Sequence, residues 1–271
     1  MPTVTLDLWH TLIYLSPDAE ERYMLRQLVL AAEVLAGSPP QPNGPGPGSV
    51  DLQDAFEREY ARAVAQAEEG RTVTSAEQLT RAAKACGRVP HPERYLAALK
   101  QEVGETPFQC APGAVDLLRE LHDEGLRVAV ISNTVGEPGA FLRPTLQRMG
   151  FDPFVDAYVF SDEHPWTKPA PELFRWTLER LGARPADAIH VGDGWSDIEG
   201  ARRAGFRAGI LFTGLQSYGA RYRSLFLPRN GERLSSDYRV DSLADVPPLI
   251  RSILSHEPNA GADGGSPASR S

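Results

Sequence analysis

The fold of this chain is decided near its start, by the ten residues TVTLDLWHTL (residues 3–12). Val4 and Leu6 alternate with threonines in a short run rich in β-branched residues, a pattern typical of a buried strand. This strand delivers Asp7 at its carboxyl end. Ligands of open α/β sheets bind at the carboxyl ends of the strands, so Asp7 suits a nucleophile or a metal ligand. An Asp that merely opens a turn is the alternative at this point.

The composition is that of an ordinary globular protein, with 41% hydrophobic and 24% charged residues among 271. This length can hold one substantial core and a smaller subdomain. The formal net charge of −8 argues against a nucleic-acid partner, which would need a basic face. No apolar run approaches the roughly 20 residues of a membrane span, and no signal-peptide pattern opens the chain. Cys86 and Cys110 form no ligand pattern. We therefore expect a cytoplasmic protein without a membrane partner.

The segment from residue 16 to residue 106 reads as a run of helices. Helices are expected over residues 17–36, 50–69, 74–87 and 92–103. The third opens with the capping-box sequence Thr74-Ser75-Ala76-Glu77. Residues 37–49 are rich in Pro and Gly, so regular structure is not expected there. The segment is therefore expected to be a helical subdomain inserted after the first strand.

From Pro112 onward, helical and strand patterns alternate. Strands are expected over residues 126–131, 157–160, 188–191, 207–212 and 238–240, with helices between them and after the last. Such alternation indicates a parallel sheet with right-handed crossovers. The expected fold class is therefore α/β, with a Rossmann-like parallel sheet core formed by residues 1–15 and 107–255. Residues 256–271 are expected to be a disordered tail, because their composition cannot build a core.

Several polar residues fall at the carboxyl ends of expected strands or on the loops that follow them. They are Asp7, Ser132 with Asn133, Lys168, and Asp193 with Asp197. Taken singly, each has an ordinary interpretation as a turn residue, a solvated lysine or a helix cap. Taken together, a carboxylate, a hydroxyl, a cation and a pair of acids can hold a phosphoryl group and a divalent metal while Asp7 attacks.

Four motifs of the chain resemble those of the haloacid dehalogenase (HAD) superfamily over about residues 3–213. They read LDLWHTL, VISNT, KPAPELF and HVGDGWSDIEGARRAGF, and the last is the most specific. The helical insert at residues 16–106 resembles the small cap domain that this family places between its first and second motifs. The resemblance implies a HAD-like core with a cap closing over the site.

The resemblance also implies roles for individual residues. Asp7 would be the nucleophile, Ser132 would bind the phosphoryl oxygens and Lys168 would neutralise both Asp7 and the transferring group. Asn133, Thr11 and Trp9 would join Ser132 in binding substrate. The implied cofactor is magnesium (Mg²⁺), held by Asp7, Asp193 and the backbone carbonyl of Trp9, with Asp197 either as a further ligand or beside the ligands.

Trp9 is a departure from the family pattern. HAD phosphatases carry a second Asp at this position, two residues after the nucleophile, as general acid and base. Such help is worth about 10²–10⁴ in rate, so a phosphatase lacking it should be slow unless the leaving group is good or another group substitutes. His10 and His164 are the candidate substitutes. His10, however, would face away from Asp7 on an extended backbone, and the alternative for His164 is a surface histidine.

Three functions remain open from the sequence. The first is a Mg²⁺-dependent phosphatase of a small phosphorylated metabolite that forms an aspartyl-phosphate on Asp7. The second is a 2-haloacid dehalogenase, which Trp9 favours and the retained Asp193 disfavours, since dehalogenases need no metal. The third is a non-catalytic HAD-fold binding protein that has lost one acid. The sequence is compatible with a monomer or a homodimer.

Overall fold

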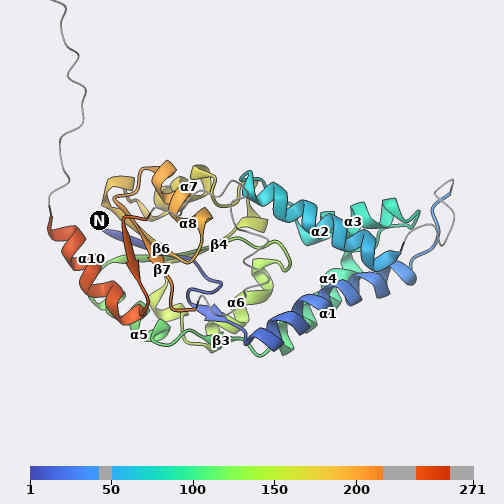
Figure 1. The fold of residues 1–271 in the computed structure, drawn as a ribbon, viewed down its shortest axis with the longest axis horizontal. Coiled ribbons are helices and arrows are strands. Elements are labelled where there is room, and N and C mark those ends of the chain that lie inside the picture. Colours follow the sequence, from blue (N-terminus) through green and yellow to red (C-terminus); the bar gives the residue numbers. More distant parts are fainter. Residues whose placement is uncertain (43–50, 216–235, 257–271) are drawn as a thin grey trace, which may run out of the picture.

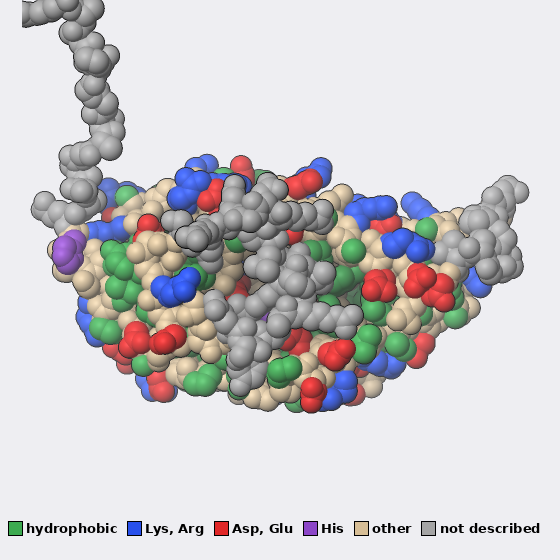
Figure 2. Space-filling model, viewed as in Figure 1, with side chains coloured by type: hydrophobic (Ala, Val, Ile, Leu, Met, Phe, Trp, Pro, Cys, Tyr) green, Lys and Arg blue, Asp and Glu red, His purple; other side chains and the backbone are tan. Residues whose placement is uncertain are grey.

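The structure is a computed structural model that describes residues 1–42, 51–215 and 236–256. The expected disordered tail, apart from His256, lies outside the described residues, as does most of the Pro/Gly-rich stretch at 37–49. Among the described residues, no helix is long and apolar enough to cross a membrane. On the face drawn in Figure 2, acidic and basic side chains are interspersed over the surface.

A six-stranded parallel sheet lies at the centre of the core, in the order β5-β4-β1-β6-β7-β8. The strands are β1 (Thr3–Leu6), β4 (Arg127–Ser132), β5 (Ala157–Phe160), β6 (Ala188–Gly192), β7 (Ala208–Phe212) and β8 (Tyr238–Val240). The expected α/β class and its strands are confirmed. The chain crosses from β1 to β4 on one side and later to β6 on the other. Strand order reverses at β1, which is where ligands bind in open α/β sheets.

The register of the three central strands brings their carboxyl ends to one level. Leu6 pairs with Val130 of β4 and with Val191 of β6. The Asp7 amide then donates to the Val191 carbonyl at 2.8 Å. Residues that follow these strands therefore meet at one edge of the sheet.

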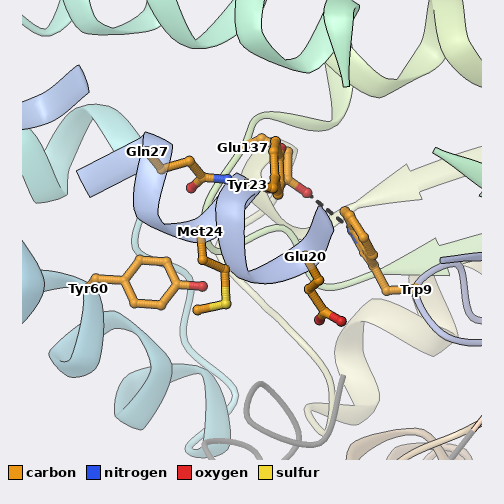
Figure 3. Close-up of a pocket in the computed structure, with 7 residues that line it drawn as sticks. All are labelled: Trp9, Glu20, Tyr23, Met24, Gln27, Tyr60 and Glu137. Atoms are coloured by element: carbon orange, nitrogen blue, oxygen red, sulfur yellow. Dashed lines mark hydrogen bonds between the residues drawn. The ribbon is translucent and has the colours of Figure 1, made fainter. Parts of the chain in front are cut away.

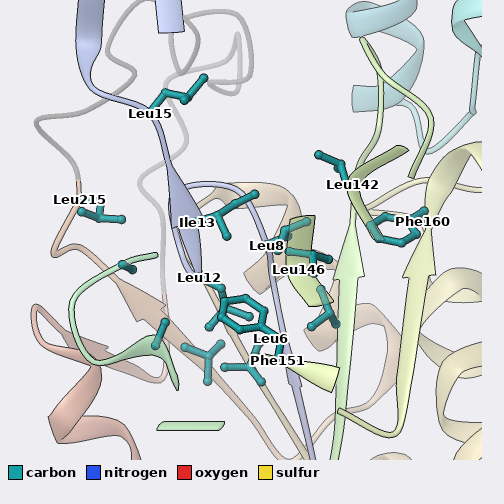
Figure 4. Packing of buried hydrophobic residues seen from close by; sticks show 14 of the residues in the cluster. Leu6, Leu8, Leu12, Ile13, Leu15, Leu142, Leu146, Phe151, Phe160 and Leu215 are labelled. Carbon is teal, nitrogen blue, oxygen red and sulfur yellow. The ribbon is translucent and has the colours of Figure 1, made fainter. Parts of the chain in front are cut away.

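Helices cover both faces of the sheet (Figure 1). One face carries α5 (Ala114–Asp123) and α10 (Val246–Ser255), and the other carries α7 (Pro171–Leu181) and α8 (Trp195–Ala204). Between β4 and β5 the chain forms α6 (Gly139–Arg148). The main hydrophobic cluster joins β1 and the turn after it to α6 and β5, as Leu6, Leu8, Leu142 and Phe160 show in Figure 4. Burial of such side chains stabilises the core by about 1.5–3 kcal/mol each.

Four helices form a lobe beside the sheet (Figure 1). They are α1 (Pro17–Ala36), α2 (Leu52–Glu68), α3 (Ser75–Ala85) and α4 (Pro92–Glu105), in agreement with the four expected helices. The capping box at Thr74 is confirmed, because Thr74 and Glu77 exchange both of its hydrogen bonds. Inside the lobe, the rings of Phe56 and Tyr95 meet edge to face at 5.3 Å between centroids.

The two chain segments that join the lobe to the core pair with each other. They form β2 (Ile13–Tyr14) and β3 (Gln109–Cys110), an antiparallel pair. The sequence did not predict them, because strands of two residues carry no measurable periodicity. The pair holds the entry to the lobe and the exit from it side by side.

The described beginning of the Pro/Gly-rich stretch at residues 37–49 forms no helix or strand, as expected, but hydrogen bonds hold it against the residues after α3. The Val89 amide donates to Pro39, the Gln41 amide donates to Gly87, and Pro40 forms a bridge with Arg88. The Arg88 guanidinium also donates to the Ser38 carbonyl at 2.8 Å. Proline lacks an amide hydrogen but keeps its carbonyl, so it can still accept bonds from the end of α3.

Candidate active site

The backbone turns sharply after Asp7. The amides of Leu12 and Ile13 both donate to the Leu8 carbonyl at 2.9 Å, and His10 has a φ of 59°. The assumption of an extended backbone at His10 is therefore wrong. Its ring is buried, and Nε2 lies 3.2 Å from Glu20 Oε1. The tight turn at residues 8–12 thus directs the His10 ring toward α1.

Thr11 lies on the same turn and contacts the proposed nucleophile. Its hydroxyl donates to Asp7 Oδ2 at 3.2 Å, and both side chains are buried. This bond orients the Asp7 carboxylate. A contact between Thr11 and substrate stays a prediction.

Lys168 is the centre of the buried charges. Its Nζ contacts Asp7 Oδ1, and it donates to Asp197 Oδ1 at 2.6 Å and to the Ile131 carbonyl at 2.9 Å. All three charged side chains are nearly inaccessible to solvent. One cation therefore links two carboxylates that are distant from each other in the sequence.

Asn133 holds the backbone of Lys168 in place. Its Nδ2 donates to the Lys168 carbonyl at 3.0 Å, and its Oδ1 accepts from the Lys168 amide at 2.8 Å. Both polar atoms of the Asn133 side chain are thus hydrogen-bonded to the backbone of Lys168. A role for Asn133 in binding substrate stays a prediction, and what the structure describes is a positioning contact.

The buried charged groups shift one another's pKa values. Burial raises the pKa of Asp7 to about 6, with Lys168 opposing the rise and Asp197 adding to it. Burial works in the same direction on Asp197, but Lys168 and His190 outweigh it and hold that pKa below its usual value. Burial would lower the pKa of Lys168, yet Asp197 and Asp7 together raise it. Asp197 and Lys168 are therefore a stable ion pair, and of the two carboxylates that contact Lys168, Asp7 is the more easily protonated.

His190, on β6, was not among the residues that the sequence indicated. Its Nδ1 is 2.7 Å from the Thr5 hydroxyl and its Nε2 is 3.2 Å from Asp197 Oδ1. Burial lowers its pKa. A single His inside an apolar strand gives no signal in the sequence, because only the pairing of β1 with β6 brings Thr5 beside it.

Three carboxylates could hold a metal ion at this edge of the sheet. Asp7, Asp193 and Asp197 each offer an oxygen, and these oxygens lie within 4.8 Å of one another. An all-oxygen set suits Mg²⁺. Both oxygens of Asp197 already accept hydrogen bonds, one from Lys168 and His190 and the other from the Gly194 amide at 3.0 Å. Both oxygens of Asp7 also accept a hydrogen bond, from Lys168 and from Thr11, but Asp197 accepts more. The donor set therefore fits an ion held mainly by Asp7 and Asp193, with the Trp9 carbonyl as a predicted further ligand.

The Ser132 hydroxyl lies at the end of β4, beside β1. The side chain is fully buried, and among the described residues none forms a hydrogen bond with its Oγ. A buried hydroxyl normally has a partner. Ser132 can therefore donate to a group that arrives from outside.

The Trp9 side chain forms one wall of a small cavity between α1 and the loop after β4 (Figure 3). Its indole Nε1 donates to Glu137 Oε1 at 3.1 Å. Its ring stacks on Tyr23 at 6.3 Å and meets Phe108 edge-on at 5.4 Å between centroids. The position that carries the general acid in HAD phosphatases is thus occupied by an aromatic ring that packs against the helical lobe.

Glu137 was also missed by the sequence reasoning, although it lies only five residues after Ser132. It is 6% exposed and accepts hydrogen bonds from neutral groups, Trp9 among them and Gln27 at 3.5 Å. Burial raises its pKa to about 7, against the effect of its Tyr23, Trp9 and Gln27 donors. Its surroundings come from α1, so only the fold identifies it.

His164 does not join this group in the structure. Its ring packs against Trp176 of α7 at 4.2 Å between centroids, and burial lowers its pKa. A role for His164 as a substitute acid has no support from these contacts.

The first turn of α3 and the loop before it contact the core around the site. The Ser75 hydroxyl donates to the Gly136 carbonyl at 2.7 Å, and Gln78 Nε2 donates to the Val135 carbonyl at 2.6 Å. The Thr72 hydroxyl donates to Ser161 at 3.0 Å. These bonds join the helical lobe to the loops that follow β4 and β5.

Comparison with known proteins identifies the family. A family model described as haloacid dehalogenase-like hydrolase matches residues 1–205. Phosphonoacetaldehyde hydrolase of Bordetella pertussis is 30% identical over 176 residues, which cover 59% of this chain and 62% of that protein. Phosphoglycolate phosphatase 1 of Pseudomonas aeruginosa is 33% identical over 103 residues, 38% of this chain and 37% of that protein. The chain therefore spans less than two thirds of the length of either relative.

The fold has solved counterparts as well. The crystal structure of a HAD phosphatase from Thermococcus onnurineus matches with a TM-score of 0.56 and 20% identity, covering 95% of this chain and 100% of that chain. At this identity the likeness shows the fold alone. With the family model matching most of the chain, the protein belongs to the haloacid dehalogenase-like hydrolase family.

Proposed function

We propose that the chain is a Mg²⁺-dependent phosphohydrolase that transfers the phosphoryl group of a small metabolite to Asp7. The observation that carries this proposal is Lys168, whose ammonium group bridges Asp7 and Asp197 beside a third carboxylate, Asp193. Such an arrangement neutralises charge around a carboxylate that must approach an anionic phosphoryl group. The similarity to phosphoglycolate phosphatase 1 of Pseudomonas aeruginosa also supports this reaction class.

The reaction would proceed in two steps on the residues of the site. A carboxylate oxygen of Asp7 attacks phosphorus, the bond to the leaving oxygen breaks, and that oxygen takes up a proton. Water then attacks the phosphorus of the aspartyl-phosphate, loses a proton and releases inorganic phosphate and Asp7. The Lys168 ammonium and the Ser132 hydroxyl would stabilise the phosphoryl oxygens throughout. Bound Mg²⁺ would supply further positive charge beside Asp7 and the phosphoryl oxygens.

Asp197 would orient Lys168 instead of binding the ion. Its two oxygens accept three hydrogen bonds from Lys168, His190 and the Gly194 amide. This leaves Asp7, Asp193 and the Trp9 carbonyl as the proposed protein ligands of Mg²⁺. Trp9 itself cannot donate an acid proton, so the reaction would be slow for leaving groups that need protonation.

We further propose that residues 16–106 act as a cap that closes over this site. The hydrogen bonds from Ser75 and Gln78 to the loop after β4 support a closed arrangement. The pair β2–β3 would be the hinge, since both connections pass through it. Closure would exclude water from the site.

A screen for phosphate release tests the proposal. The pure protein should release phosphate from at least one small phosphate ester in Mg²⁺, and excess chelator should stop the release. Halide release from 2-haloacids, measured on the same preparation, tests the dehalogenase alternative. Halide release that persists in chelator would favour the dehalogenase over the phosphohydrolase. Release of neither product would favour a binding protein.

A further inference from the structure

Two residues that line the cavity beside Trp9 follow closely in sequence on residues of the proposed active site. Trp9 follows Asp7 by two residues, and Glu137 follows Ser132 by five. The other lining residues come from the helical lobe: Glu20, Tyr23, Met24 and Gln27 of α1, and Tyr60 of α2. Figure 3 shows these side chains around α1, with Tyr60 on one side and Trp9, bonded to Glu137, on the other. A group bound there would contact both the core and the proposed cap.

Two carboxylates face this cavity. Glu137 is held by neutral donors only, and no lysine or arginine is among the described residues that line the space. Glu20 is 6% exposed, with Oε1 beside His10, and among the described residues no hydrogen bond reaches its Oε2. A buried carboxylate oxygen without a donor is unfavourable, so its presence at a cavity wall points to a donor that arrives with a ligand.

The remaining lining favours a cation. Trp9, Tyr23 and Tyr60 contribute aromatic rings to the lining, and Met24 contributes a polarisable thioether. Aromatic faces attract ammonium groups, most strongly where water is excluded. The cavity volume of about 20 Å³ is sufficient for one group of the size of a water molecule or an ammonium.

We propose that this cavity binds the far end of the leaving group and selects substrates that end there in an ammonium, namely small aminoalkyl phosphates. This inference rests on the proposed phosphohydrolase function, whose site it completes. Glu20 Oε2 and the Glu137 carboxylate would accept hydrogen bonds from the ammonium. A carboxylate in the same place would face two acids and no cation, so acidic leaving groups are rejected.

Binding to the catalytically silenced variant Asp7→Asn tests this selection apart from hydrolysis. Calorimetry should compare aminoethyl phosphate, ethyl phosphate and carboxymethyl phosphate, which differ only at the end that enters the cavity. Aminoethyl phosphate should bind more tightly than ethyl phosphate by on the order of tenfold, the effect of one charge-assisted hydrogen bond, and carboxymethyl phosphate should bind most weakly.

Glu20→Gln and Glu137→Gln, each added to Asp7→Asn, should abolish the preference for the ammonium and leave the affinity for ethyl phosphate nearly unchanged. The matched control is Glu21→Gln, which removes the same charge from the exposed face of α1. Thermal melts establish that each variant is folded. Steady-state kcat/KM of the wild-type sequence on the same three esters gives the second readout.

Equal affinities for the three esters, or a preference that survives both substitutions, would overturn the inference. If phosphate is released from the three esters without preference, the phosphohydrolase proposal is supported and the ammonium site is contradicted. If aminoethyl phosphate binds through Glu20 and Glu137 but no ester is hydrolysed, the proposed reaction is contradicted and the ammonium site is supported. Absence of binding by all three esters would contradict the inference directly.

Discussion

The indole nitrogen of Trp9 donates a hydrogen bond to Glu137 Oε1 at 3.1 Å, which ties the turn after the proposed nucleophile to the loop after β4. The family's phosphatases place an acid where this indole lies. In this chain the indole instead bonds to a buried carboxyl, Glu137, on the loop after β4. Trp9 therefore shapes the leaving-group cavity and supplies no proton.

Trp9→Asp should speed hydrolysis of alkyl phosphates if proton donation limits the reaction. The gain should approach the range of about 10²–10⁴ that positioned acids and bases contribute, and it should be smaller for aryl phosphates. Trp9→Asn is the matched control, because it makes the same hole without the carboxyl group. Losing the ring contacts with Tyr23 and Phe108 costs up to about 3–5 kcal/mol, so thermal melts precede kinetics. Equal rates for the two folded variants would contradict a reaction limited by a missing acid.

Asp193→Asn should raise the Mg²⁺ concentration needed for half-maximal activity. The loss should exceed the roughly 10–100-fold change in affinity seen when a residue that merely orients a ligand is removed. Magnesium titration of activity measures the effect, and Asp123→Asn, an exposed acid at the end of α5, is the control. An unchanged magnesium dependence would exclude Asp193 as a ligand.

Asn133→Ala should lower kcat more than it raises KM. The substitution removes both hydrogen bonds to the Lys168 backbone. A displacement of about 1 Å at such a group can cost about 10²-fold in rate. Steady-state kinetics separates the two parameters. A raised KM with an unchanged kcat would instead assign Asn133 to substrate binding, as the family resemblance implies.

Glu137→Gln should flatten the pH dependence of stability. Burial raises the pKa of Glu137 from 4.5 to about 7, so the folded protein holds this proton more tightly than the unfolded chain does. That stabilisation is fully present below pH 4.5 and is lost as pH rises through about 7. At about 1.4 kcal/mol per pKa unit, the variant should gain up to about 3 kcal/mol relative to wild type over this interval.

Denaturant unfolding of both proteins at several pH values measures this difference. The other titrating groups, Asp7 among them, are common to both proteins and largely cancel. A difference in unfolding free energy that stays constant with pH would mean that the pKa of Glu137 is not raised in the folded protein.

Much of the fold could be predicted because its signals are local. The apolar strand at 3–6, the capping box at Thr74 and the alternation after Pro112 each depend on neighbours in sequence, and all are confirmed. The two-residue strands β2 and β3 could not be predicted, since their pairing joins segments almost a hundred residues apart.

The residues of the site also divide into those with a local signal in the sequence and those without one. Asp7, Lys168 and Asp197 were indicated because each follows a strand or opens a helix, and parallel strands bring such positions together. His190, Glu137 and Glu20 were not indicated, because each is defined by a partner from a distant element. The orientation of His10 was wrong for a related reason, since the tight turn around Leu8 replaced the extended backbone.

In the proposed reaction, Asp7 becomes phosphorylated during turnover. Acid quenching of the protein during turnover in Mg²⁺, followed by mass spectrometry of the peptide containing Asp7, tests it most directly. We expect the added mass of one phosphoryl group on Asp7 in the wild-type sequence, with neither adduct nor phosphate release in Asp7→Asn. Phosphate release by pure Asp7→Asn at the wild-type rate would contradict it.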